Sequence, residues 1–117
     1  MSFDPNEFLR LAHAIARDSD DEARLRSAVG RAYYAVFLQA RERLGLRGHR
    51  RKIHGLVIGR LKSVNRAAGD QLDKLETLRG EADYELEVQD PLHRDWRSNW
   101  ASASSYAAYI SRRLRGL

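Results

Sequence analysis

Apolar side chains recur along this chain at intervals of three and four residues, the spacing that lines one face of an α-helix. No segment alternates apolar and polar positions as a half-buried strand does. The longest run predicts a helix about 35 Å long, and its apolar positions are Leu25, Ala28, Val29, Ala32, Tyr33, Val36, Phe37, Ala40 and Leu44. Five such segments joined by short loops predict an all-α, up-and-down bundle of about five helices, with residues 1–117 as a single domain.

Capping signals mark where the first two helices begin. Asp4 can cap the first, with Pro5 at its first position, Glu7 reaching back and Phe3 packing on Phe8. A second capping box, Ser19 with Glu22, opens the long helix, and Gly45 can end it.

Three further helices are predicted after a loop at residues 46–51. The third helix buries Ile53, Leu56, Val57, Leu61 and Val64, and the polar segment "NRAAG" ends it. The fourth begins near Asp70 and places Leu72, Leu75, Leu78, Ala82 and Leu86 on one side. The last carries a heptad-like seam of Trp96, Trp100, Ala103, Ala107, Ile110 and Leu114, so its tryptophans are interpreted as core or interface anchors.

The charges divide the chain into contrasting blocks. Residues 43–69 carry 8 basic and 0 acidic side chains, whereas residues 70–90 carry 2 basic and 8 acidic ones. The basic block is compatible with a polyanionic partner such as a nucleic acid. It is equally compatible with two neighbouring helices that neutralise each other.

Several classes of site are excluded or disfavoured by composition. The chain has no cysteine, which removes disulfides, zinc-thiolate sites and thiol catalysis and fits a reducing cytoplasm. No apolar run reaches the roughly 18 residues of a membrane span, so a soluble, cytoplasmic protein without a membrane partner is expected. The four histidines lack metal-ligand spacing and no glycine-rich phosphate loop is present, so neither metal nor cofactor is expected.

The chemistry that remains is that of arginine and histidine acting on a phosphodiester. Cleavage without a metal needs proton transfer, which histidine performs near neutrality, and a fixed cation for the charge on phosphorus, which arginine supplies. The segment "LRGEADYEL" places Arg79, Asp83 and Tyr84 close together on one helix. Arg79 and Asp83 are four apart and can pair.

Three segments together resemble prokaryotic HEPN domains (higher eukaryotes and prokaryotes nucleotide-binding). They are "RSAVGRAYYAVFLQARERL", "KIHGLVIGRL" and "LRGEADYEL", and the resemblance spans roughly residues 8–115. It implies a small helical bundle, commonly a homodimer, and often the toxin-type half of a toxin–antitoxin unit whose antitoxin is a minimal nucleotidyltransferase. Many such proteins are metal-independent endoribonucleases.

The sequence departs from that family at the catalytic motif. These enzymes use an arginine followed after four to six residues by a histidine, yet five residues beyond Arg79 stands Tyr84, and Gly80 occupies a position that is often asparagine. Arg47 and His54 satisfy the spacing formally, within a segment where arginine is so frequent that chance explains the match. Whether the protein is an enzyme therefore stays open.

Two interpretations of the polar residues follow. In one, Arg79 and Asp83 form an intrahelical pair and the Tyr84 hydroxyl bonds a neighbouring helix. In the other, Arg79 binds phosphate and His54 is the acid–base residue of an RNA or nucleotide site. The binding residues would then be Arg31, Tyr34, Asp83, Tyr84, Arg47, Arg50, Arg51 and Lys52.

Three functions are consistent with these features. The first is an RNA- or nucleotide-binding toxin-type protein, with metal-independent cleavage as its activity if it is an enzyme. The second is a non-catalytic helical module that dimerises and holds a partner enzyme. Tyr34, which lies off the apolar stripe, suits a dimer interface there. The third is generic nucleic-acid binding through the basic block.

Overall fold

The computed structural model describes residues 3–47 and 51–117, and it folds them into five α-helices. These are α1 (Asn6–Ala16), α2 (Glu22–Arg43), α3 (Ile53–Val64), α4 (Arg66–Tyr84) and α5 (Trp96–Arg115), with a short 3-10 turn, η1 (Pro91–His93), before α5. No strand occurs in these two ranges. The predicted all-α bundle is confirmed.

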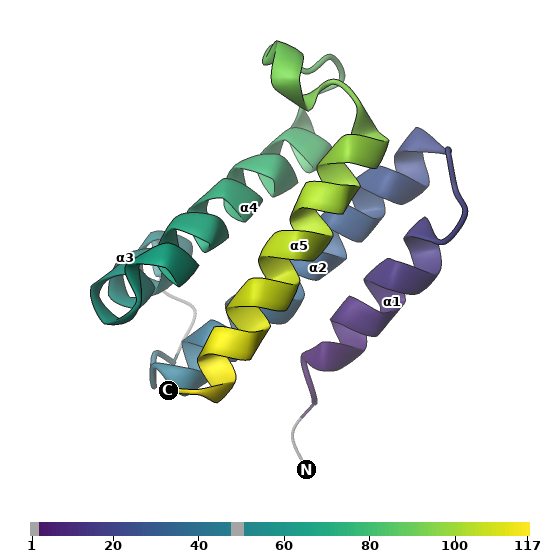
Figure 1. The fold of residues 1–117 in the computed structure, drawn as a ribbon. Coiled ribbons are helices and arrows are strands. Elements are labelled where there is room, and N and C mark those ends of the chain that lie inside the picture. The colour runs from purple at the N-terminus through teal and green to yellow at the C-terminus, as the bar shows by residue number, and fades with distance from the viewer. Residues whose placement is uncertain (1–2, 48–50) are drawn as a thin grey trace.

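The long helix α2 is the centre of the bundle, because α1, α4 and α5 all pack against it, while α3 packs chiefly on α4 (Figure 1). Its inward face holds Val29, Tyr33 and Val36, each fully buried. They meet Leu72 and Leu75 of α4 in one continuous core. Burying side chains of this size stabilises the fold by about 1.5–3 kcal/mol each.

The helix starts differ in detail from the predicted caps. Phe3 and Phe8 pack together, with ring centroids 4.9 Å apart, and the predicted Asp4 carboxylate accepts from the Asn6 amide at 3.0 Å, although α1 begins at Asn6 and not at Pro5. The predicted box of Ser19 and Glu22 is wrong, because Asp21 is the N-cap of α2 and its carboxylate accepts from the Ala23 amide. The predicted stop at Gly45 is consistent with its φ of 70°.

The start of the fourth helix departs most from the prediction, because α4 begins at Arg66 and not near Asp70. "NRAAG" does not separate two helices, because Asn65 caps α4 directly through its side chain and Ala68 and Gly69 are buried inside that helix. Gly69 allows the close approach, since a Cβ there would lie 2.6 Å from the Cα of Lys62 in α3. On α3, Ile58 is buried, whereas the predicted Leu56 and Val64 are exposed.

The far end of α4 is held by an arginine of α2. Nη1 of Arg26 donates to the carbonyl of Glu85 at 2.6 Å, and it also lies near those of Glu81 and Ala82. Its guanidinium covers the Trp96 ring, 4.6 Å from the centroid. Arg26 thus satisfies terminal carbonyls of α4 and ties α2, α4 and α5 together.

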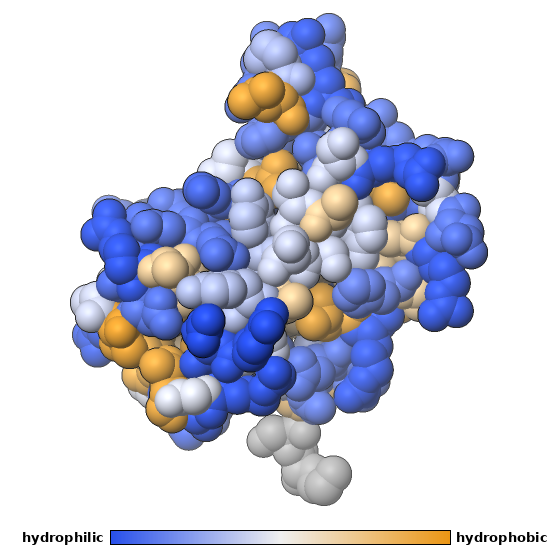
Figure 2. Space-filling view, viewed as in Figure 1, coloured by the Kyte–Doolittle hydropathy of each residue, from blue (hydrophilic) through white to orange (hydrophobic). Residues whose placement is uncertain are grey.

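The connection from α4 to α5 extends beyond the ends of the other helices (Figure 1). Leu86, predicted on the inner side of the fourth helix, lies beyond its last residue and is 99% exposed. Leu92 is 84% exposed, and an orange hydrophobic patch is visible on this projection in Figure 2. Among the helices of the described ranges, none combines the length and apolarity needed to cross a membrane.

Candidate functional site

Helices α2, α3 and α4 bring one group of polar and aromatic side chains together, here called the Arg79 cluster. Its members are Tyr33, Tyr34, Phe37, His54, Glu76, Arg79 and Asp83. The structure therefore places Arg79 and His54, the predicted catalytic pair, in one cluster although they come from different helices.

Arg79 is largely enclosed, with its side chain 12% exposed. Its guanidinium lies over two rings, 5.2 Å from the Tyr33 centroid and 5.7 Å from that of Tyr34. The predicted pair with Asp83 is present at 3.5 Å, and Glu76 lies at 3.5 Å on the other side. These distances exceed the roughly 2.8 Å of a tight charge-assisted hydrogen bond, so neither carboxylate holds Arg79 closely.

One donor of Arg79 is left over. Its Nε atom is buried and has no hydrogen-bond partner among the residues that the structure describes. Buried N–H groups in folded proteins are nearly always paired, and an exception calls for an explanation. Burial alone would lower the pKa of Arg79, but the Tyr34 and Tyr33 hydroxyls and the neighbouring carboxylates together raise it. The guanidinium is therefore a fixed cation with unused donor capacity.

His54 lies in the first turn of α3 and packs on the aromatic face of α2. Its ring stacks on Phe37 with centroids 4.2 Å apart, and its Nδ1 atom lies 2.6 Å from the Tyr33 hydroxyl. Burial lowers the pKa of His54, and the positive charge of Arg79 lowers it further, against the opposing effect of Glu76. His54 is consequently a neutral imidazole at pH 7.

Tyr33 connects the two functional groups, since it touches the guanidinium and hydrogen-bonds the imidazole. Burial, followed by the nearby Glu76 carboxylate, raises the pKa of Tyr33 although Arg79 acts in the opposite direction. The phenol thus keeps its proton near neutrality. Its hydrogen bond with Nδ1 of His54 can form with either imidazole tautomer, so the other ring nitrogen, Nε2, can carry a hydrogen or accept one.

Of two other predicted binding residues, Arg31 lies at the edge of the cluster and Asp83 belongs to it. Arg31 extends over Phe8 and Tyr34, with its guanidinium carbon 5.4 Å and 5.9 Å from their centroids. Asp83 lies close to α2 at Gly30, where a Cβ would be in ordinary contact with its carboxylate at 3.8 Å.

The remaining predicted residues are not brought into the cluster. Tyr84 is 78% exposed at the end of α4, because five residues rotate a helix by about 140° relative to Arg79. Arg47 lies 3.8 Å from Glu42 and is exposed, as are Arg51 and Lys52. Arg50 lies outside the described residues.

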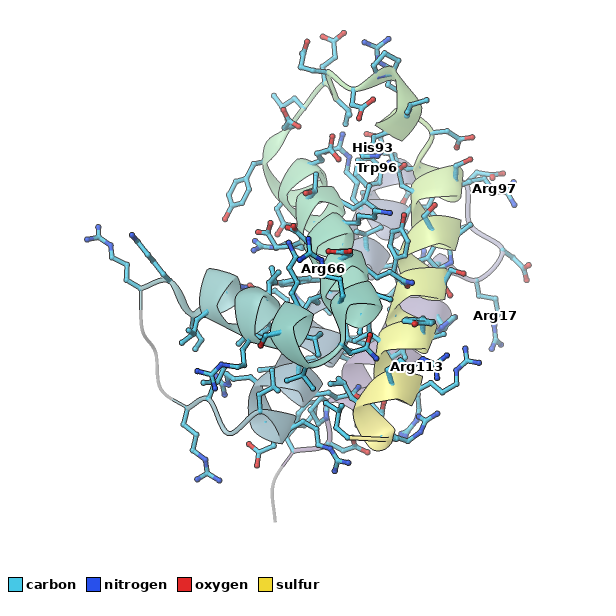
Figure 3. The ribbon with its side chains drawn as sticks, turned by 60° about the vertical axis from the view of Figure 1, so that its left-hand side comes forward. Arg17, Arg66, His93, Trp96, Arg97 and Arg113 are labelled. Carbon is cyan, nitrogen blue, oxygen red and sulfur yellow. The ribbon has the colours of Figure 1, made fainter. Side chains whose placement is uncertain are left out.

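The basic and acidic blocks do meet in part. Lys62 of α3 donates to Asp73 of α4 at 2.9 Å and lies 4.0 Å from Asp70, which Arg66 also contacts (Figure 3 labels Arg66). Neutralisation between neighbouring helices, one of the two interpretations of the charge blocks, thus occurs between Lys62 of α3 and the start of α4.

Three members of the cluster were not predicted as site residues. Tyr33 and Phe37 fit the apolar stripe of α2 so well that they were assigned only to the core. Glu76 was overlooked, although its place three residues before Arg79 puts it on the same helix face. That spacing was the one available signal.

Chemically, the cluster offers the fixed cation of Arg79, the neutral imidazole of His54 and the Tyr33 phenol, which contacts both. Such a set can bind an anion and move a proton without a metal. No protein-family model, curated protein or solved structure matches this chain.

Proposed function

We propose that the protein binds RNA or a nucleotide at the Arg79 cluster and cleaves RNA without a metal. The observation that carries this proposal is the buried Nε of Arg79, which has no hydrogen-bond partner among the described residues and lies in the same cluster as His54. A phosphate group supplies the missing acceptor, because guanidinium and phosphate match in shape and charge. Arg79 would stabilise the developing charge, and His54 would act as the acid–base residue.

The resemblance to HEPN domains supports the biological part of this proposal. It favours a toxin-type protein, a homodimer, and a nucleotidyltransferase antitoxin as partner. In such a dimer the half-exposed side of Tyr34, next to Arg31, would lie at the interface. The cluster would then be shared between two copies, and this would supplement a motif that is incomplete in one chain.

The test is RNA cleavage on a denaturing gel in the presence of chelator, with total tRNA and a generic single-stranded RNA. We expect discrete fragments from the wild type and none from Arg79→Gln or His54→Gln. His93→Gln is the matched control, because His93 lies in η1 and its ring hydrogen-bonds Glu81, outside the cluster. Intact RNA with folded wild-type protein, or fragments that persist in both cluster variants, would refute the proposed cleavage.

A specific observation favours a second function, that of a non-catalytic module that holds a partner. The projecting α4–α5 connection exposes Tyr84, Leu86 and Leu92 by 78, 99 and 84%. Large exposed apolar side chains on one short segment can anchor a protein partner. If RNA stays intact, substitution of Leu86 and Leu92 by serine should abolish binding to a co-expressed nucleotidyltransferase and leave thermal stability unchanged.

A further inference from the structure

The space between α1 and α5 lies on the side of the bundle away from α3 (Figure 1), and side chains of both helices line a surface groove there. Both helices pack on α2 and make little direct contact with each other. Two adjoining hollows of 460 and 500 Å³ lie along α1 and share His13 and Arg17. Helix α5 contributes Arg97 and Trp100 to the first hollow and Arg115 to the second.

The groove is rich in arginine. Arg17 and Arg115 have no carboxylate within 4.0 Å in residues 3–47 and 51–117, whereas Arg10 pairs with Glu7. Arg97 lies 2.8 Å from Asp20 in a pair whose side chains are 69% and 81% exposed. Exposed pairs of this kind contribute about 0–1 kcal/mol and are easily exchanged for a ligand phosphate.

The groove contains one carboxylate of its own, Asp18, at the end where Ser19 also lines it. Arg17 and Arg97 lie on the same side of the bundle and point outward (Figure 3). The net charge of the lining is positive, because the arginines outnumber this single acidic side chain.

An aromatic pair lies between the arginines. The His13 ring meets the Trp100 ring edge to face, with centroids 5.1 Å apart and planes at 75°. Trp100 is partly exposed, unlike Trp96, which is 5% exposed. In Figure 2 the strip between α5 and α1 shows pale and orange surface bordered by blue. A partly open indole flanked by arginines is the arrangement on which nucleic-acid bases stack.

We infer that the α1–α5 groove binds single-stranded nucleic acid, with phosphates on Arg17 and Arg115 and a base stacked on Trp100. A duplex fits less well, since its bases are already stacked inside and cannot reach the indole. An acidic peptide could pair with the arginines but would leave the ring unused. This second site is separate from the Arg79 cluster and needs no cleavage.

The experiment measures binding of a fluorescently labelled 12-nucleotide single-stranded RNA by anisotropy, in chelator and at several salt concentrations. The groove variant is Arg17→Gln with Arg115→Gln, and its matched control is Arg51→Gln with Arg60→Gln on the exposed part of the basic block. Removing two phosphate contacts should lower the slope of log K against log salt by about 1.4 and weaken binding about 25-fold at 0.1 M salt. The control should keep the wild-type slope.

Stacking of a base on Trp100 is measured in a separate experiment, by the fluorescence of its indole ring. In a Trp96→Phe background, RNA should quench Trp100, and the same sequence as single-stranded DNA should do so too unless the 2′-hydroxyl is recognised. Arg17→Gln with Arg115→Gln in the same background should remove this quenching, which assigns the signal to the groove and not to the Arg79 cluster. Loss of binding in the control pair with the groove pair unaffected, equal affinity for a duplex, or an unquenched Trp100 at saturation would each overturn the inference.

Discussion

Replacing Gly69 with alanine should destabilise the protein by forcing α3 away from α4. A Cβ at this position would lie 2.4 Å from Cγ of Lys62 and 2.6 Å from its backbone N and Cα. Carbon atoms in contact are normally about 3.5–4.0 Å apart, so α3 must move by about 1 Å. His54 lies on α3 and Arg79 on α4, so the same movement disturbs the candidate site.

The magnitude follows from two opposing effects. Overpacking of this kind costs about 1–3 kcal/mol, while alanine in place of glycine within a helix gains about 0.5–1 kcal/mol. Gly80, in the same helix, is the matched control, since a Cβ there meets nothing within 4 Å. We therefore expect Gly80→Ala to gain about 0.5–1 kcal/mol and Gly69→Ala to be about 1–3 kcal/mol less stable than Gly80→Ala.

The assay is urea and thermal unfolding followed by far-ultraviolet circular dichroism. At about 4 °C per kcal/mol, the melting temperatures of the two variants should differ by about 4–12 °C. If Gly69→Ala is as stable as Gly80→Ala, α3 and α4 do not approach each other as described, and the account of how the site is positioned fails.

Three other changes test separate parts of the structure. Arg26→Met should lower the free energy of unfolding by about 1.5–3 kcal/mol, measured in urea, because carbonyls at the end of α4 lose a charged donor. An unchanged urea midpoint would contradict that capping role. The His54 ring signals in an NMR titration should give a pKa below the usual 6.5, and Arg79→Gln should raise that pKa. Since the unfolded chain binds this proton more tightly, His54 should contribute stability above about pH 6.5 that is lost as pH falls through its folded pKa, and a titration at or above 6.5 would refute the burial argument. Asp95→Ala should lower stability by about 1 kcal/mol, because its carboxylate accepts from the Arg97 and Ser98 amides at the start of α5, and a loss below about 0.3 kcal/mol would argue against the cap.

The fold was predictable because the spacing of apolar residues is a local property of the sequence. The buried positions of α2 and α5 follow the three-four pattern almost throughout, with Trp100 only partly covered. Helix ends were less predictable, since short polar side chains compete as caps. Ser19 and Asp21 lie two residues apart, and the Ser19 hydroxyl instead accepts from the Asp21 amide.

The start of α4 was missed for a different reason. Gly69 signals a break when read locally, yet here it serves a close approach to Lys62 that only the packed bundle reveals. Leu86 was assigned to the core because it continues the apolar spacing of the fourth helix. The helix ends at Tyr84, however, so Leu86 lies on no helix face and is exposed.

The candidate site was predictable only in part, because it is built from three helices. Arg79 and His54 could be proposed from their chemistry, and Asp83 from its spacing to Arg79. The part played by Tyr33 could not be foreseen, since a tyrosine on the apolar stripe gives no sign of what its hydroxyl contacts. The groove between α1 and α5 likewise depends on two helices that are distant in sequence.

The most direct test of the Arg79 cluster as a phosphate-binding site is an NMR titration of the histidine ring signals with a single-stranded RNA hexamer in chelator. We predict a saturable shift of the His54 signals that Arg79→Gln abolishes and that Arg17→Gln with Arg115→Gln preserves. If His54 stays unmoved while RNA is bound, the cluster is a structural feature of the core and the proposed function is wrong.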